Sequence, residues 1–182
     1  MSGSLALSKL AVRPWRVEDA EALAAAVAQS IEHLRPWMGW IAAEPLSIEQ
    51  RRANIERWQA ERRSGGDMLF GIFVGDQAVG ACGLHRRMGP DELEIGYWVH
   101  VDHTQKGYAT TAAAMLTSLA FSYPSINAVE IHTDKQNHVS SGVPRKLGYV
   151  HSGELPKRPE APCETGVQDR WRMTRSAWFA GS

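Results

Sequence analysis

The chain has very little cysteine, no net charge and no long hydrophobic run, and each absence excludes a class of protein. Only two of its 182 residues are cysteine, Cys82 and Cys163, so a disulfide scaffold is excluded and we expect a reduced, cytoplasmic protein. Twenty basic residues balance twenty acidic ones, which argues against nucleic acid as a partner. No run suits a membrane span, and residues 1–10 do not resemble a signal peptide.

Several signature motifs are also missing. The seven histidines are scattered and neither HExxH nor CxxC occurs, so we expect no metal site. The phosphate-binding sequences GxGxxG and GxxxxGK[ST] are absent too. The composition is that of a globular chain, and its length predicts a single domain over residues 1–182, with residues 1–8 disordered.

The most informative stretch runs from Glu92 to Phe121 and predicts a strand, a polar turn with one glycine, and a long helix. In the strand, Leu93, Ile95 and Tyr97 share one face, whereas Glu92, Glu94 and Trp98 share the other. The helix has an apolar stripe formed by Ala109, Ala112, Leu116, Leu119 and Ala120. The unpaired NH groups at the start of a helix attract anions, so the turn is a candidate phosphate site. The alternative is a tight connection with no ligand.

The remaining segments complete an α/β or α+β pattern. Ser47 and Gln50 form a predicted capping box at the start of a helix that runs to about Arg63. The other predicted helices are Glu18–Glu32 and Val139–Leu147, and the other predicted strands are Leu10–Trp15, Met68–Val74, Ala78–His85, Ala128–Thr133, Tyr149–Leu155 and Gln168–Thr174. This order predicts a mixed sheet of about seven strands flanked by about four helices.

Four stretches, in this order, resemble the GNAT N-acetyltransferase superfamily and within it the RimJ/RimL-like branch. They are LRPWMGW (34–40), ELEIGYWV (92–99), QKGYATTA (105–112) and NHVSSGVPRKLGY (137–149). The third is similar to the pyrophosphate loop of the family, in which Gly107 and Ala109 fit the pattern. Thr104 departs from it, since the family has Gln or Arg at that position. Gln105 or Lys106 would take over its role.

The resemblance implies a GNAT-like, mostly antiparallel sheet, splayed in the middle, with acetyl-CoA as co-substrate between two parallel strands. These strands would be 92–101 and 128–133. Asn137 would hold the pantetheine arm from one side. The arm would pair with the backbone of Trp98, Val99, His100 and Val101, and the pyrophosphate would bind NH groups of Gln105, Lys106, Gly107, Tyr108, Ala109 and Thr110.

Acetyl transfer to an amine needs a base for the amine proton and a proton for the departing thiolate. Glu94, in the EIGYW motif, is the first candidate base; the alternative is a structural ion pair. Ser140, in the N-x-x-S pattern, is the candidate acid; the alternative is a helix N-cap. Many family members carry a tyrosine acid where this chain has Pro144. Further candidate bases are Glu92, His85 and His100.

Trp37 and Trp40 follow Pro36, where the RimJ/RimL-like branch lines its acceptor cleft; the alternative for both is core packing. The predicted function is direct acetyl transfer from acetyl-CoA to a primary amine, either a protein N-terminus or a small amine. Two alternatives are an acyl-CoA-binding sensor without turnover and an enzyme that acetylates aminoacyl-tRNA through the arginine-rich helix 47–63. A homodimer is an open alternative to a monomer.

Overall fold

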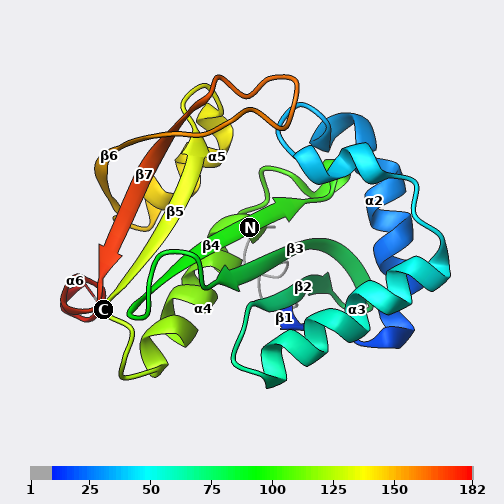
Figure 1. The fold of residues 1–182 in the computed structure, drawn as a ribbon, viewed down its shortest axis with the longest axis horizontal. Helices are drawn as coiled ribbons and strands as arrows, with labels where there is room; N and C mark the ends of the chain where they lie inside the picture. The colour runs from blue at the N-terminus through cyan, green and yellow to red at the C-terminus, as the bar shows by residue number, and fades with distance from the viewer. Residues whose placement is uncertain (1–9, 182) are drawn as a thin grey trace, which may run out of the picture.

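The computed structural model of the protein describes residues 10–181, so the disorder predicted for residues 1–8 lies outside the described residues. The strands of this part of the chain are β1 (Leu10–Pro14), β2 (Met68–Val74), β3 (Gln77–His85), β4 (Glu92–Val99), β5 (Ala128–Asp134), β6 (Val150–Pro156) and β7 (Val167–Thr174). They form one sheet in the order β1-β2-β3-β4-β5-β7-β6 (Figure 1).

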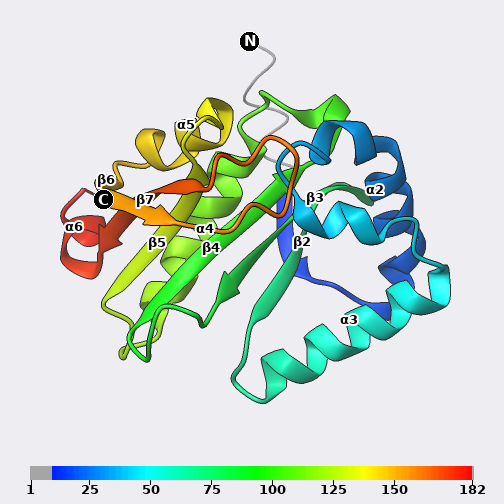
Figure 2. The same ribbon diagram turned by 45° about the horizontal axis from the view of Figure 1, so that its top comes forward.

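The helices cover both faces of this sheet. Their bounds are α2 (Ala20–Leu34), α3 (Ile48–Arg63), α4 (Tyr108–Ser122), α5 (His138–Lys146) and α6 (Arg175–Ala180), with short 3-10 turns η1 (Val17–Asp19), η2 (Gly39–Ala43) and η3 (Val101–His103). Figure 2 shows α4 and α5 on one face, and α2 and α3 on the other. Within residues 10–181, no helix combines the length and the apolar character that crossing a membrane requires.

The pair formed by β4 and β5 is parallel, whereas every other neighbouring pair of the described sheet is antiparallel. The two strands pair only from Glu92 opposite Ala128 to Ile95 opposite Ile131. Beyond this point both strands continue but diverge, and they form the two arms of a V in Figure 1. The predicted mixed and mostly antiparallel sheet, splayed in its middle, is therefore confirmed.

Two apolar clusters hold the helices to the sheet. On the α4 face, Leu93, Ile95 and Leu116 belong to a cluster of buried side chains, which agrees with the predicted strand face and helix stripe. On the α2 and α3 face, Trp15 and Ile55 belong to a second buried cluster. Both faces of the sheet that contains the V are therefore covered by close-packed apolar side chains.

Most predicted segments agree with the structure within two residues. The capping box is confirmed, since the Gln50 NH donates to Ser47 Oγ over 3.2 Å and the Ser47 NH donates to Gln50 Oε1 over 2.8 Å. Two expectations need correction. The central strand ends at Val99 rather than Val101, because residues 101–103 turn into η3, and the terminal helix α6 was not predicted.

Candidate active site

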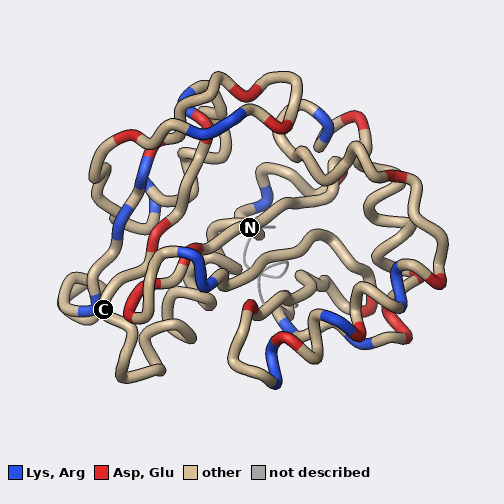
Figure 3. Tube along the Cα trace, viewed as in Figure 1, with Lys and Arg blue, Asp and Glu red and all other residues tan. Residues whose placement is uncertain are grey.

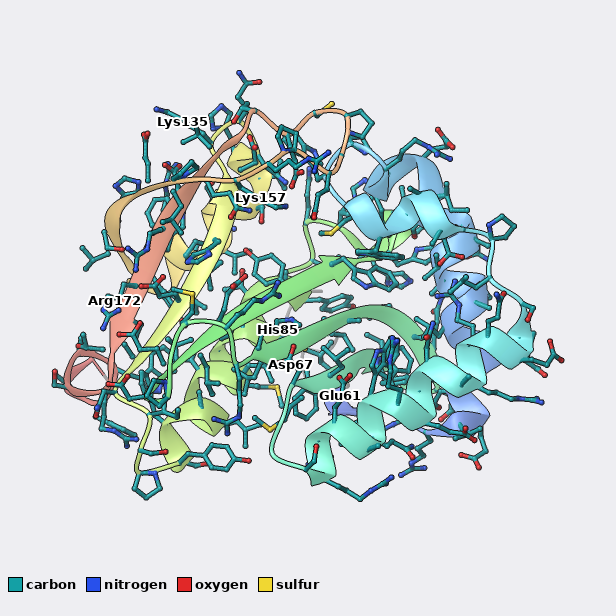
Figure 4. The ribbon with its side chains drawn as sticks, viewed as in Figure 1. Glu61, Asp67, His85, Lys135, Lys157 and Arg172 are labelled. Atoms are coloured by element: carbon teal, nitrogen blue, oxygen red, sulfur yellow. The ribbon has the colours of Figure 1, made fainter. Side chains whose placement is uncertain are left out.

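A cleft of about 860 Å³ occupies the space beside the splayed strands. Its walls come from the segment around η2, the first turns of α3, strands β3, β4 and β5, and the connection between β6 and β7. Figure 4 shows Lys157, from this connection, above the gap between the strands, and His85 and Asp67 nearer the centre of the sheet. The cleft thus gathers residues from distant parts of the chain at the V.

The alternation of side chains along β4 separates two groups of polar residues. Glu94 and Trp98 point to the α2 and α3 face, since Trp98 packs against the cluster on that side. Tyr97 points the other way and packs against the α4 cluster. The gap between β4 and β5 therefore connects a cleft that contains Glu94 with a region next to α5 that contains Ser140.

Ser140 forms a hydroxyl pair with Tyr97 beside the gap. Its Oγ donates to the Tyr97 hydroxyl over 3.2 Å, and that hydroxyl donates to the Ser140 carbonyl over 2.9 Å. Burial raises the pKa of the Tyr97 hydroxyl above its usual range. The N-cap of α5 is Asn137, whose Oδ1 accepts from the Ser140 NH over 3.2 Å. The capping alternative for Ser140 is therefore wrong, and its hydroxyl is not used to cap the helix.

Glu94 lies in the cleft wall with its side chain 15% exposed. Its Oε2 is 3.3 Å from Arg87 Nε and 3.7 Å from His132 Nδ1. Glu94 thus takes part in an ion pair and also faces the cleft, so both of its predicted roles fit this position. Glu92 instead pairs with Arg172 on β7, which Figure 4 shows on the far side of the V, and it does not line the cleft.

Sequence reasoning missed His132 and Glu130, two polar residues that alternate with Val129 and Ile131 in strand β5. His132 Nε2 lies 2.7 Å from Glu130 Oε2. The Glu130 side chain is fully buried and also accepts from Arg170 and Arg172. Burial by itself would raise the pKa of Glu130, but hydrogen bonds from His132 and the two arginines lower it to about 2. Figure 3 shows the basic and acidic segments that alternate across these strands.

The other two candidate histidines have structural partners. His85 lies in the cleft wall, and its Nδ1 is 2.6 Å from Asp67 Oδ2. His100 is buried, its Nε2 pairs with Gln29 Oε1 over 2.8 Å, and its Nδ1 accepts from the Asp102 NH. Both ring nitrogens of His100 are therefore used within the fold.

The predicted phosphate turn has the geometry of an anion site. Gly107 (φ 80°) and Gln105 (φ 60°) are left-handed, and α4 begins directly after Gly107. Within residues 10–181, the NH groups from Gln105 to Thr110 find no hydrogen-bond acceptor. Consecutive free NH groups at the start of a helix of 15 residues favour a bound anion. The Lys106 ammonium donates to the Asp102 carbonyl over 2.9 Å, beside the turn.

The backbone of residues 98–101 was predicted to pair with the pantetheine arm, but two of its NH groups already have partners within the fold. The His100 NH donates to the Val79 carbonyl over 2.8 Å, and the Val101 NH donates to Ser30 Oγ over 3.1 Å. These two positions have no NH left for a pantetheine arm, contrary to the prediction for them. Trp98 and Val99 lie on the diverging part of β4, where the edge toward β5 pairs with no other described strand.

Five tryptophans line the cleft, among them the two predicted for the acceptor side: Trp15, Trp37, Trp40, Trp58 and Trp98. Trp40 remains 41% exposed, and its ring lies 6.0 Å from that of Trp98, centroid to centroid. Core packing is therefore the wrong interpretation for Trp40. Amphipathic rings with one open face are typical of binding surfaces.

Metal ligands and thiols are the other groups that could take part in catalysis. In the described part of the chain, no group of three His, Cys, Asp or Glu side chains is arranged to hold a metal ion. Cys82 is buried, and burial raises the pKa of its thiol above the usual range, so a role as nucleophile is unfavourable.

Comparison with known proteins agrees with this geometry. A family model described as "Acetyltransferase (GNAT) domain" matches residues 9–150. The Bacillus subtilis protein named "Putative ribosomal N-acetyltransferase YdaF" is 27% identical over 147 residues, which cover 80% of each chain. The structure of RimL, a ribosomal L7/L12 alpha-N-protein acetyltransferase, in complex with coenzyme A has a TM-score of 0.84 at 17% identity, covering 93% of this chain and 96% of that one.

Mycobacterium smegmatis RimJ, in complex with a CoA disulfide, has a TM-score of 0.80 at 24% identity and covers 92% of this chain and 82% of that one. These names agree with the branch that the four sequence motifs predicted. The family model spans more than three quarters of the chain and includes the turn, the splayed strands and Ser140. The chain is thus an acyltransferase and belongs to the GNAT acetyltransferase family.

Proposed function

We propose that the protein transfers the acetyl group of acetyl-CoA directly to a primary amine, and that the amine is the N-terminus of a peptide or protein. The observation that carries this proposal is the gap between β4 and β5. Strand β4 leads through η3 into the turn with the free NH groups of residues 105–110, and the cleft beside the gap is lined by Glu94 and five tryptophans.

Acetyl-CoA fits the α4 side of the gap. The free NH groups of the turn are suited to the pyrophosphate, and the unpaired edge of β4 at Val99 is suited to the pantetheine amides. Asn137 lies on the α5 side of the gap, next to Ser140. An acetyl group at the end of this arm would reach the point where the strands part.

The amine would approach from the cleft side. Its nitrogen attacks the thioester carbonyl, the C–N bond forms, and the C–S bond breaks with its electron pair on sulfur. One proton leaves the nitrogen and one reaches the thiolate. Glu94 faces the amine, directly or through a water, and the Ser140 hydroxyl, paired with Tyr97, faces the sulfur. No covalent enzyme intermediate is required.

Two observations favour a peptide acceptor. The cleft has a volume of about 860 Å³ and aromatic walls, and YdaF and RimL carry the names of ribosomal acetyltransferases. The tRNA alternative rests on the arginines of α3, but Arg51, Arg52 and Arg57 pair with Glu44, Glu21 and Glu61. Figure 3 likewise shows acidic segments among the basic ones along this helix.

The proposal is tested by incubating the protein with acetyl-CoA and a panel of short peptides, each with a free or a formylated N-terminus. We expect CoA release and acetylated product only with free N-termini. Equal CoA release from both forms, or release only with small amines, would overturn the peptide acceptor. Spermidine and amino acid amides serve as the small-amine part of the panel.

We predict that Ser140→Ala lowers kcat about tenfold or more while the Kd for acetyl-CoA changes little, because only the departing thiolate needs the hydroxyl. Ser141→Ala is the matched control. The Ser141 hydroxyl pairs with Thr133 instead, so its removal should cost about 1 kcal/mol of folding stability without a comparable loss of kcat. Equal kcat values for the two variants would contradict the assignment.

We predict that Trp40→Ala raises the KM for the peptide about tenfold, since an aromatic contact of this kind contributes roughly 1.4 kcal/mol or more. Phe179→Ala is the control, because Phe179 is an exposed aromatic on α6 outside the cleft. Steady-state kinetics at varied peptide concentration measure both variants. An unchanged KM in Trp40→Ala would move the acceptor away from η2.

A further inference from the structure

We propose that the general base of this enzyme is a pair formed by Glu94 and His132, in which His132 Nδ1 holds the proton taken from the amine and Glu130 positions the imidazole. The inference rests on the proposed function and names the group that performs its proton transfer. It is carried by the position of His132, by its hydrogen-bond partners and by the charges around it.

His132 occupies the point where the sheet opens. Ile95 opposite Ile131 is the last pair of the parallel strands, so His132 is the first β5 residue beyond the pairing. Its side chain belongs to the cleft wall and is 7% exposed. Glu94, which precedes the last pair on β4, lines the same wall. An acetyl group delivered through the gap would meet the amine beside these two residues.

The Glu130 carboxylate determines which nitrogen of His132 carries hydrogen. Glu130 is fully buried and accepts from Arg170 and Arg172, so it is ionised and can only accept. The ring nitrogen 2.7 Å away, Nε2, must therefore be the donor. In the neutral imidazole, the lone pair is then on Nδ1. That nitrogen lies 3.7 Å from Glu94 Oε2, on the cleft side.

The surrounding charges suit an imidazole that becomes positive during the reaction. Glu94 and Arg87 approach from β4 and the segment before it, Glu130 shares β5, and Arg170 and Arg172 come from β7. The two arginines balance much of the charge of Glu130. Glu94 is the carboxylate next to Nδ1, where the new proton would lie, and it would stabilise the imidazolium.

An N-terminal ammonium, with an ordinary pKa of about 7.7–8.0, gives one proton to Nδ1 and becomes nucleophilic. After attack and cleavage of the C–S bond, the second nitrogen proton is lost as the amide forms, and the thiolate gains one through the Ser140 hydroxyl. The imidazolium then releases its proton to solvent.

The alternative is that His132 only bridges two carboxylates and stabilises the fold. His132→Gln keeps a polar side chain but cannot act as a base, and we expect its kcat to fall about 100-fold with little change in the Kd for acetyl-CoA. His132→Ala should regain at least part of its kcat when imidazole is added. A residue with a purely structural role would not respond to imidazole in this way.

His151→Ala is the matched control. His151 also pairs with a carboxylate, Asp169, over 2.9 Å, but it lies on β6 outside the cleft. We expect near-normal kcat and no effect of imidazole. If His132→Gln keeps at least half of the kcat, or His132→Ala ignores imidazole, the role of His132 is overturned while the proposed function stands. If the unmodified protein acetylates no amine, the proposed function itself is overturned.

A spectroscopic measurement tests the inference even if the variants fail to fold. Nitrogen-15 NMR of the histidine side chains in the unmodified protein reports which ring nitrogen carries hydrogen. We expect His132 to be protonated at Nε2, with a free lone pair at Nδ1 in its neutral form. A neutral His132 protonated at Nδ1 would overturn the role of Glu130 and, with it, the proposed base.

Discussion

Gly107→Val is expected to weaken acetyl-CoA binding tenfold or more. Gly107 has a φ of 80°, a conformation that costs an ordinary L-residue about 1–2 kcal/mol and a β-branched one more. An added Cβ would meet no protein atom within 4 Å, so the fold itself leaves room for it. The side chain would instead project at the turn whose NH groups point toward the proposed pyrophosphate, and the altered backbone would turn those NH groups away.

Gly65→Val separates this effect from backbone strain. Gly65 also has a φ of 80° and open space around its Cβ position, but it lies after α3 and does not line the cleft. Calorimetric titration of both variants with acetyl-CoA gives the comparison. A normal Kd in Gly65→Val and a weakened one in Gly107→Val would support the turn as the phosphate site. An unchanged Kd in Gly107→Val would place the phosphates elsewhere.

Glu130→Ala is expected to lower the free energy of unfolding by about 3–5 kcal/mol. Glu130 is fully buried and joins His132, Arg170 and Arg172, so its removal leaves two cations beside the sheet without their shared partner. Urea denaturation at pH 7 measures the change. Glu154→Ala is the control, because Glu154 pairs with Lys135 at the surface, where such pairs contribute about 0–1 kcal/mol.

The effect of Glu130 should also depend on pH. Its pKa is about 2 in the folded protein, below the ordinary value of 4.5, so the ionised form stabilises the fold. This contribution is fully present above the ordinary pKa and is lost as the pH falls toward about 2. The difference between the unmodified protein and Glu130→Ala should therefore shrink on acidification. A difference that stays constant with pH, or one below 1 kcal/mol at pH 7, would contradict the described network.

The sequence alone predicts the features that depend on local patterns of residues. Alternation in 92–99, the glycine turn at Gly107 and the capping box at Ser47 each involve residues close together in the chain, and the structure confirms all three. The four motifs identified the family because they occur along the chain in the order that the family has. Helix α6, of six residues, has too few turns for a clear periodic pattern.

The features that sequence reasoning missed depend on pairing between distant segments. Tyr97 and Ser140 are 43 positions apart, and their hydroxyls meet only because β4 and α5 flank the same gap. His132 stands beside Glu94 because of the register of the parallel strands, which the sequence does not reveal. One local signal was present: Glu130 and His132 alternate with apolar residues in β5, which places two polar side chains on one face of a central strand.

The sensor alternative differs from the enzyme only in that it would not turn acetyl-CoA over. Both would bind acetyl-CoA through the turn and the splayed strands, and Thr104, which departs from the family pattern, does not distinguish them. Its hydroxyl donates to the Val101 carbonyl over 3.2 Å and so helps to close η3. The groups that a sensor would not need lie on both sides of the gap: Glu94 and His132 on the cleft side, and the Ser140–Tyr97 pair next to α5.

Amine-dependent turnover of acetyl-CoA, measured as free CoA and as acetylated product by mass spectrometry in one sample, distinguishes the enzyme from the sensor. We expect one CoA for each acetylated peptide N-terminus, and almost none when the peptide is omitted or its N-terminus is blocked. Binding of acetyl-CoA without acetylation of any amine in the panel would contradict the account and favour the sensor.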